Sequence, residues 1–421
     1  MLTAVVLVTG SELVRGGRVD ENGPFVAREL STRGIEPAGI HVVGDQPELL
    51  EQALRQALEA DLVVTSGGLG PTHDDRTVEM LAAVAGRPLV LDPELEREIG
   101  HVVRGLSERF RRPYEEFEAG VRKQATIPEG AASLGLAGTA PGLVLDVGGT
   151  VVVVLPGPPG ELQRLWARAL ETEPVQRVFA AARMPGHTIL RFFGLPESAV
   201  ARVIEGTGGE REGLSVTICA HDLEVQVDLV VEPEAVEHAH RLQQALRDEL
   251  PQALFADDER PVEAMVLDLA RERGLTLAAA ESCTGGLVAA RLTSVPGSSD
   301  AFVGGVVAYE DRIKRDLLGV PAELLELHGA VSAEAAAAMT AGARKALGAD
   351  VAVSVTGVAG PGGGSEEKPV GLVYLHAAGP EGEKASELHL PGERQAVRRR
   401  AAASALHLLR RLLAQSRHSQ A

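Results

Sequence analysis

The chain has 421 residues, of which 45% are hydrophobic and only 3% aromatic. This length predicts two or three domains, with cores built mainly from Val, Leu and Ala. The formal net charge of −18 argues against a broad nucleic-acid-binding surface, which would be basic. Neither Cys219 nor Cys283 lies in a CxxC or Cys/His zinc pattern. Because no basic region precedes Leu2 and no apolar run reaches about 18 residues, we expect neither a signal peptide nor a membrane-spanning helix.

The first part of the chain alternates between strand and helix patterns. A continuous apolar run at residues 2–9 predicts a buried strand. Residues 35–43 and 61–65 are the second and third strand candidates. Residues 22–33 and 47–60 predict helices, with Asn22 and Asp45 as their capping residues. This alternation predicts a mostly parallel, three-layer α/β domain.

Glycine- and proline-rich loops follow or precede these strands. The loop at residues 65–75 offers backbone N–H groups to a phosphate, and Asp74 and Asp75 are oxygen ligands suited to Mg²⁺. The alternative is a glycine turn followed by an acidic first helical turn at Asp74 and Asp75. Similar loops at residues 138–142 and 155–160 would line the same crevice. The predicted substrate-binding residues of this domain are Gly67, Gly68, Gly70, Thr72, Gly138, Thr139, Gly142, Pro156 and Gly157.

Residues 172–255 have a different pattern. Strand-like runs at 188–193 and 223–231 flank a helix at 196–205, and a second helix is expected at 234–249. We therefore expect a small α+β domain, without a nucleic-acid signal because the segment is acidic and lacks a GXXG clamp.

The sequence Ala279–Gly286 is the main chemical candidate of the last part of the chain. An apolar run leads into it and an Ala/Leu-rich run leads out, so we expect a strand, a tight turn and a helix. Ser282 in this turn would lie at a helix N-terminus, where backbone N–H groups near Thr284, Gly285 and Gly286 can stabilise an oxyanion. The alternative is that Ser282 or Thr284 only caps the helix.

A base for Ser282 is expected downstream, at Lys314. The chain has five Lys and 36 Arg, so a Lys stands out, and only Lys can act as a base because Arg stays protonated. The alternative is a solvated surface Lys. A third loop, at residues 354–364, follows another strand, and its glycines at 357, 360, 362 and 363 would allow a ligand to approach the backbone. The lesser alternative is a flexible loop without a ligand.

Two further helices are expected at residues 332–347 and 393–415. Ser332 and Gly348 would cap the first helix. The second is amphipathic, with Val397, Ala401, Leu408 and Leu412 near one face. Arg398, Arg399 and Arg400 on this helix are interpreted as a solvated face, with phosphate binding as the lesser alternative. The tail after Ser416 is expected to fray.

Residues 262–413 resemble the C-terminal domain of the CinA (competence/damage-inducible) family, a nicotinamide mononucleotide (NMN) deamidase of the PncC type. The resemblance is carried by the Ala280–Gly286 motif, Tyr309 with Lys314, His328–Ser332, Thr356–Pro361 and Glu367–Gly371. It implies that Ser282 attacks the carboxamide, Lys314 takes its proton and Tyr309 orients or relays. It implies no cofactor for this domain.

Residues 1–170 resemble the N-terminal CinA domain, which is related to the MogA- and MoaB-like molybdopterin-binding fold. The resemblance is carried by Gly10–Leu13, Asp20 with Asn22, Ser66–Asp75, Arg122–Ala125 and Leu155–Pro159. It implies an ADP-ribose pyrophosphatase that uses a divalent metal such as Mg²⁺, held by Asp74 and Asp75. The family also implies a KH-like fold for the middle domain.

Together these observations predict three domains, at residues 1–170, 171–257 and 258–416, in a cytoplasmic protein that forms a homodimer. The predicted function is recycling of pyridine nucleotides, with NMN and ADP-ribose as small-molecule partners and no nucleic acid or membrane. Two alternatives remain open, a molybdopterin-handling transferase and a non-catalytic adaptor in DNA uptake or repair, because a fold does not fix a function.

Overall fold

The structure is a computed structural model that describes residues 2–380 and 382–414. The chain divides into two compact units, Met1–Pro185 and Gly186–Ala421. The three-domain division at residues 170 and 257 stays a prediction. The predicted helix end at Gln415 and the tail after Ser416 lie outside the described residues.

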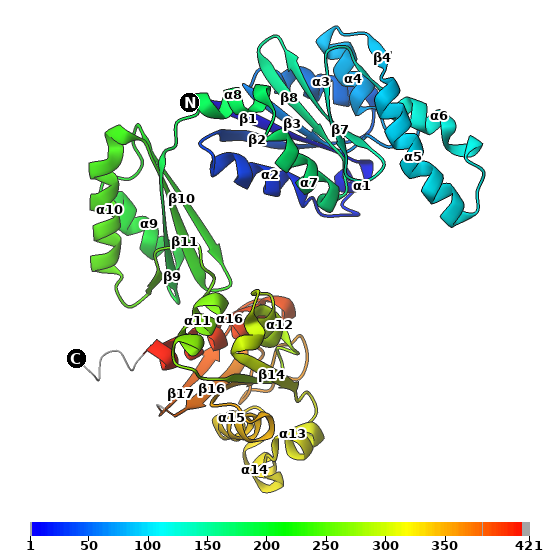
Figure 1. The fold of residues 1–421 in the computed structure, drawn as a ribbon. Coiled ribbons are helices and arrows are strands. Elements are labelled where there is room, and N and C mark those ends of the chain that lie inside the picture. Colours follow the sequence, from blue (N-terminus) through cyan, green and yellow to red (C-terminus); the bar gives the residue numbers. More distant parts are fainter. Residues whose placement is uncertain (1, 381, 415–421) are drawn as a thin grey trace. The chain divides into compact units, whose positions relative to one another are not determined.

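The first unit is built on a six-stranded sheet of order β2-β1-β3-β8-β7-β6 (Figure 1). Strands β2, β1, β3 and β8 are parallel, and β7 and β6 continue the sheet in antiparallel pairing. The strands are β1 (Thr3–Thr9), β2 (Glu36–Val43), β3 (Leu62–Ser66), β6 (Ala132–Leu136), β7 (Pro141–Val147) and β8 (Thr150–Leu155), with a separate antiparallel pair β4 (Leu89–Leu91) and β5 (Thr126–Pro128). The helices are α1 (Ser11–Val14), α2 (Asn22–Ser31), α3 (Pro47–Ala57), α4 (Thr77–Ala85), α5 (Pro93–Phe110), α6 (Glu115–Gln124), α7 (Pro159–Ala169) and α8 (Glu173–Ala181).

Alternate residues of the central strands face two different cores. On β3, Leu62 and Val64 pack with Trp166 of α7, whereas Val63 packs with Leu50 of α3 on the opposite face. This alternation is what a sheet covered on both faces requires. The predicted mostly parallel, three-layer α/β fold is therefore confirmed.

Two predicted helix caps are wrong, because the polar side chains bind elsewhere. Asn22 is the first residue of α2 rather than its cap, and its side chain donates to Ser66 Oγ at 2.9 Å and to the Gly157 carbonyl at 2.7 Å. Asp45 accepts hydrogen bonds from the backbone N–H and the hydroxyl of Ser11, at 2.9 and 2.6 Å. Both side chains thus tie together loops at the carboxyl ends of strands, which the sequence pattern did not indicate.

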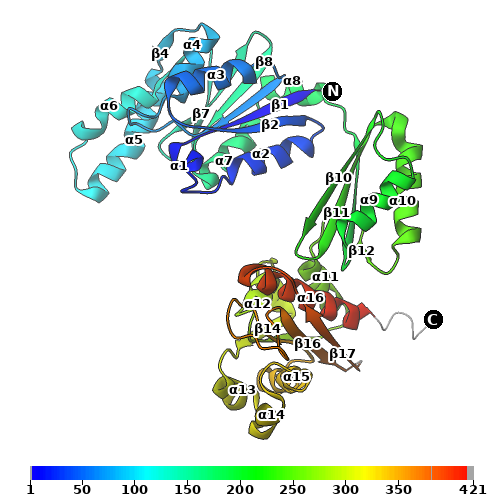
Figure 2. The same ribbon diagram turned by 180° about the vertical axis from the view of Figure 1, so that it is seen from behind.

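The second unit begins with a four-stranded antiparallel sheet of order β10-β11-β9-β12. Figure 2 shows α9 and α10 against one face of it. The elements are β9 (Gly186–Phe193), α9 (Glu197–Gly206), β10 (Leu214–His221), β11 (Glu224–Val231), the short 3₁₀ helix η1 (Pro233–Ala235), α10 (Val236–Glu249) and β12 (Leu254–Ala256). The α+β prediction named β9, α9, β11 and α10 but missed the two edge strands, β10 and β12.

A five-stranded sheet of order β14-β13-β15-β16-β17 forms the rest of the second unit. Strands β14, β13 and β15 are parallel, and β16 and β17 are antiparallel additions. The strands are β13 (Leu277–Glu281), β14 (Phe302–Val307), β15 (Val351–Gly357), β16 (Leu372–Gly379) and β17 (Gly382–His389). The helices are α11 (Val262–Glu272), α12 (Leu287–Thr293), η2 (Ser298–Asp300), α13 (Asp311–Leu318), α14 (Ala322–His328), α15 (Ala333–Leu347) and α16 (Arg394–Ala414).

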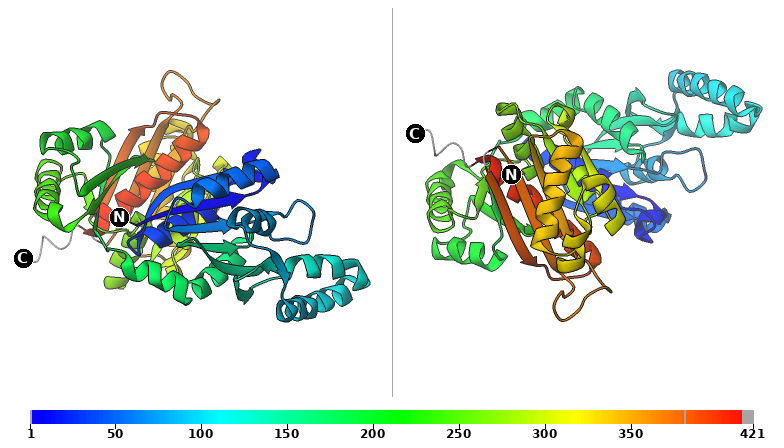
Figure 3. Two further views of the ribbon diagram at one scale, coloured as in Figure 1. Left: turned by 90° about the horizontal axis from the view of Figure 1, so that it is seen from above. Right: turned by 90° about the horizontal axis from the view of Figure 1, so that it is seen from below.

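Helices cover both faces of this sheet. Figure 3 shows α16 along one face and α13 to α15 on the other. Ser332 caps α15 by accepting a hydrogen bond from Ala335 N at 3.1 Å, and Gly348 ends the helix with a left-handed φ of 63°, as predicted. Helix α16 is buried more completely than an amphipathic pattern suggests, because every residue from Ala401 to Leu409 is buried.

Candidate functional site

The strand–turn–helix predicted around Ser282 is present at the carboxyl edge of the second unit's parallel strands. The Ser282 N–H donates to the Val355 carbonyl on β15 at 2.9 Å, and Ala308 N donates to the Glu281 carbonyl at 2.7 Å. Because parallel strands end at the same edge, these contacts bring the turn after β13 next to Ala308–Tyr309 and to the loop after β15. The three segments predicted to carry the chemistry therefore meet there.

The side chain of Glu281 stabilises the turn at residues 282–286 by hydrogen bonds to its backbone. Its buried carboxylate accepts hydrogen bonds from the N–H groups of Gly286, Val288 and Ala289 at 2.9, 3.1 and 2.9 Å. It therefore caps the start of α12, which neither Ser282 nor Thr284 does. The Gly285 N–H donates to the Ser282 carbonyl at 3.1 Å. Of the three amides expected to stabilise an oxyanion, those of Gly285 and Gly286 are thus engaged within the protein, and that of the fully buried Thr284 lies against the Cys283 thiol.

Cys283 is buried beside Ser282, and its burial raises the pKa of the thiol to about 12. The thiol is therefore protonated near neutral pH. Since a thiolate is the reactive form of cysteine, Cys283 does not offer a nucleophile there.

Lys314 lies on α13, with only 2% of its side chain exposed. Its Nζ is 3.3 Å from Asp311 Oδ1 and 3.4 Å from the Tyr309 carbonyl. The surface alternative for Lys314 is therefore wrong. No hydrogen bond joins Lys314 to Ser282 in the described part of the chain. Catalytic hydrogen bonds are often longer before a substrate binds, so this does not remove Lys314 as a candidate.

Two arginines of α16 reach this edge and were not predicted as site residues. Arg394 donates to the Tyr309 hydroxyl at 2.8 Å and to the Gly360 carbonyl at 2.7 Å. Arg398 donates to the carbonyls of Cys283 and Thr284, at 3.2 and 2.8 Å. The interpretation of Arg398 as part of a solvated face is wrong, because helical periodicity does not reveal which loop packs against a helix.

The glycines of the loop after β15 differ in their surroundings. A Cβ at Gly357 would lie 2.6 Å from the Leu372 carbonyl, so close packing accounts for this residue. Gly360 has a φ of 79° and its carbonyl accepts the Arg394 hydrogen bond, while Gly362 and Gly363 are exposed. Tyr309 is 60% exposed. Ligand binding by these residues stays a prediction.

In the first unit, the three predicted loops line one cleft of about 330 Å³. It lies at the carboxyl ends of β1, β3 and β8, where open α/β sheets bind ligands. Predicted residues in its lining are Gly67, Gly68, Gly70, Asp74, Asp75, Thr139, Pro156 and Gly157. Gly142 is instead buried in β7, where a Cβ would meet the Leu134 side chain at 3.0 Å.

Asp74 and Asp75 lie in a turn that precedes α4, so the expectation that they open this helix is wrong. The Thr72 hydroxyl lies within hydrogen-bond distance of both carboxylates, and its hydrogen bond lowers the pKa of Asp74. The ammonium group of Lys123 donates to the carbonyls of Thr72 and Asp75 and fixes the backbone of this turn.

Three more carboxylates line the same cleft, those of Glu12, Asp45 and Glu161. Glu161 occupies the space that a side chain at Gly138 would need, because a Cβ there would lie 2.2 Å from its carboxylate. Burial raises the pKa of Glu161. Within residues 2–380 and 382–414, no group of three His, Cys, Asp or Glu side chains is close enough to form a complete metal site. The acidic lining suits a hard cation that takes its remaining ligands from water and phosphate.

The comparisons with known proteins agree with both resemblances. Residues 259–413 match the family model described as CinA C-terminal domain, and residues 5–174 match that described as probable molybdopterin binding domain. A CinA-like protein of Mycobacterium avium is 45% identical over 97% of this chain and 98% of its own length. One of Mycobacterium tuberculosis is 43% identical over 97% of each chain.

The chain therefore belongs to the CinA family. Among solved structures, the competence/damage-inducible protein of Agrobacterium tumefaciens is 42% identical, with a TM-score of 0.35, over 36% of this chain and 94% of its own. No helix in the described ranges has the length and apolar character needed to cross a membrane.

Proposed function

We propose that the second unit hydrolyses the amide of NMN to nicotinate mononucleotide and ammonia. The main support is that the Ser282 turn and the segment that carries Tyr309 and the buried Lys314 meet at one sheet edge in a CinA C-terminal domain. A carboxamide is a poor electrophile, so its hydrolysis needs an activated nucleophile and a stabilised oxyanion.

In this mechanism Ser282 Oγ attacks the carboxamide carbon and its proton passes to Lys314. The oxyanion of the tetrahedral intermediate would accept a hydrogen bond from the Thr284 N–H, in place of the contact of this N–H with the Cys283 thiol. When the C–N bond breaks, Lys314 returns the proton to the departing nitrogen, which leaves as ammonia. Water then hydrolyses the nicotinoyl ester by the same route and regenerates Ser282. Arg394 holds Tyr309 and the Gly360 loop around the reacting group.

For the first unit, we propose hydrolysis of the ADP-ribose pyrophosphate to AMP and ribose 5-phosphate. Asp74 and Asp75 would hold a divalent cation, which when bound neutralises phosphate charge. Five carboxylates in the cleft would repel a bare pyrophosphate, which supports the need for that cation. Thr72 and Lys123 keep the two aspartates in place, and Gly67, Gly68 and Gly70 bring backbone without side chains to the cleft lining.

The test is a chromatographic assay of the full chain and two variants against both substrates. Ser282→Ala should lose NMN hydrolysis and keep ADP-ribose hydrolysis, and Asp75→Asn should show the reverse pattern. A wild-type chain that turns over neither substrate would overturn both assignments. The match to a molybdopterin-binding domain supports a second candidate for the first unit, which adenylylation of added molybdopterin by ATP would reveal.

A further inference from the structure

The turn between β10 and β11 has an unfavourable backbone. Asp222 and Leu223 have left-handed φ values of 49° and 72°. A two-residue hairpin turn of this kind strongly favours Asn-Gly or Asp-Gly, because a side chain with a Cβ is strained there. Leu in the second position is a poor choice for the turn alone. Strain that persists in a folded protein points to another role for the residues that bear it.

The hairpin tip, residues 221–224, contacts the layer of helices that covers the second sheet. Leu223 packs against the hydrophobic core that contains α11, α12 and α16. Asp222 accepts from Arg399 of α16 at 3.2 Å, and its side chain is only 13% exposed. The strained turn is therefore held by contacts outside its own sheet.

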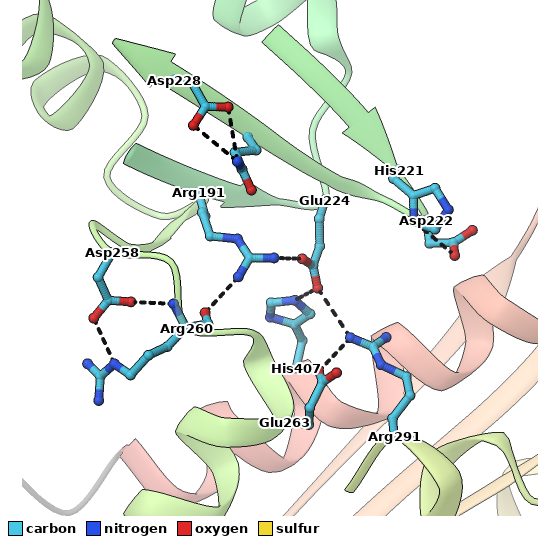
Figure 4. A network of polar contacts seen from close by, with 11 residues as sticks. Arg191, His221, Asp222, Glu224, Asp228, Asp258, Arg260, Glu263, Arg291 and His407 are labelled. Atoms are coloured by element: carbon cyan, nitrogen blue, oxygen red, sulfur yellow. Dashed lines mark hydrogen bonds and ion pairs between the residues drawn. The ribbon is translucent and has the colours of Figure 1, made fainter. Parts of the chain in front are cut away.

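Glu224, at the end of the tip, joins three elements (Figure 4). Its carboxylate lies 3.0 Å from His407 Nε2 on α16, 2.8 Å from Arg191 on β9 and 3.9 Å from Arg291 on α12. Arg291 also pairs with Glu263 of α11 at 2.7 Å. His407 is fully buried and stacks on Phe193 of β9, with ring centroids 3.7 Å apart. The tip thus fixes α16 at two points, one on each side of residue 402, and reaches α12.

Helices α12 and α16 both contact the turn at residues 282–286, which is called the serine turn below. Helix α12 starts at Leu287, directly after the turn. On α16, Arg398 donates to the carbonyls of Cys283 and Thr284, and the adjacent Arg399 binds Asp222. A displacement of this part of α16 would therefore move the contacts to the tip and the contacts to the serine turn together.

We propose that the β10–β11 hairpin tip is a positioning element for the Ser282 turn, acting through Arg399 and Arg398 of α16. This inference rests on the proposed amide hydrolysis for its effect on rate. Its structural part, that the tip keeps the turn closed, is independent of any reaction. Asp222 is then a positioning residue that touches no substrate.

The decisive variant is Asp222→Asn. Asn tolerates a left-handed φ, so the hairpin turn is kept while the charge that faces Arg399 is removed. Asp257→Asn is the matched control, because it removes the charge of another ion pair in the same part of the chain, 3.0 Å from Arg247 of α10. Thermal unfolding of both variants shows whether either is globally destabilised.

The first readout is alkylation of Cys283 by iodoacetamide, followed by peptide mass spectrometry to separate it from the exposed Cys219. Cys283 lies in the serine turn and is buried, so its labelling rate reports opening of that turn. We expect labelling several-fold faster in Asp222→Asn and at the wild-type rate in Asp257→Asn. Equal rates in all three proteins would overturn the proposal, whether or not NMN is the substrate.

The second readout is steady-state kinetics with NMN and ADP-ribose. A misplaced nucleophile lowers kcat more than it weakens binding, so Asp222→Asn should lose at least about fivefold in kcat with little change in KM. ADP-ribose turnover, carried by the first unit, should be unchanged. If the wild-type chain does not hydrolyse NMN, the function fails but the labelling result still decides the positioning role. Unchanged kcat together with unchanged labelling would refute it.

Discussion

Ser282 and Cys283 are adjacent residues of the same turn with different chemistry. Burial raises the pKa of the Cys283 thiol to about 12, whereas a serine needs only a nearby base. We expect Ser282→Ala to abolish NMN hydrolysis and Cys283→Ala to lower it by less than about threefold, since the thiol neighbours the nucleophile without replacing it. Measurement of NMN turnover by chromatography checks this. An inactive Cys283→Ala with an active Ser282→Ala would assign the nucleophile to the cysteine.

Replacement of Lys314 can distinguish a role as general base from a purely electrostatic role. Lys314→Arg keeps the positive charge but cannot accept a proton near neutral pH. We expect a loss of at least about 100-fold in kcat, the scale of a general base. Lys345→Arg, at an exposed position of α15, is the control for the substitution itself. If Lys314→Arg keeps most of the activity, Lys314 serves as a charge and the base lies elsewhere.

At the scale of elements, α16 is the helix on which both parts of the second unit depend. It covers the five-stranded sheet and carries His407 into the contact with Phe193, Phe255 and Glu224. Burial lowers the pKa of His407 from 6.5 to about 4, against the hydrogen bond to Glu224 that would raise it. Arg410 and Arg411 also disfavour its protonation. Protonation of His407 at low pH is therefore expected to destabilise the packing of α16.

This shift predicts how stability depends on pH. The pKa of His407 is lower in the folded chain than in the unfolded chain, so its contribution is complete above about pH 6.5 and is lost as the pH falls towards 4. His407→Gln keeps a donor for Glu224 without a titrating ring and should flatten this dependence, which has a slope of at most about 1.4 kcal/mol per pH unit. Urea unfolding followed by far-UV circular dichroism measures it.

The single tryptophan provides the control for that experiment. Trp166 lies in the first unit, so the unfolding transition seen by its fluorescence should have the same pH profile in both proteins. A wild-type chain whose second-unit stability is constant between pH 6.5 and 4.5 would contradict the assignment to His407.

The sequence predicted elements better than contacts. Long periodic segments such as α2 and α15 were found within about two residues, because apolar spacing and caps define them. Strand β10 was missed, since an edge strand with one solvated face has a weak apolar pattern. The caps assigned to Asn22 and Asp45 failed because both side chains bind loops that are distant in the sequence.

In the candidate sites, too, the sequence predicted local segments but not their tertiary contacts. Glycine loops and strand ends pointed to the cleft and to the serine turn. The roles of Arg394 and Arg398 depend on tertiary contacts that span up to 115 residues, and no local pattern contains that information. Glu281 lies within the Ala280–Gly286 motif, yet only the fold shows that its carboxylate caps α12.

At the scale of the whole molecule, the chain has two units with separate sheets and cores. The two proposed activities should therefore respond independently to metal removal. We expect excess EDTA to abolish ADP-ribose hydrolysis, with recovery on adding Mg²⁺, and to leave NMN hydrolysis unchanged. Full ADP-ribose turnover in EDTA would remove the role of the metal, and equal loss of both activities would contradict independent sites.

The carboxylates around the first cleft also affect how fast a substrate arrives. Both proposed substrates are anions, and the chain carries a net charge of −18. Long-range repulsion then slows diffusional encounter, and added salt weakens it as the screening length falls from about 10 Å at 0.1 M to about 3 Å at 1 M. The rate of association should therefore rise with ionic strength, opposite to the behaviour of an enzyme that attracts its substrate from a distance.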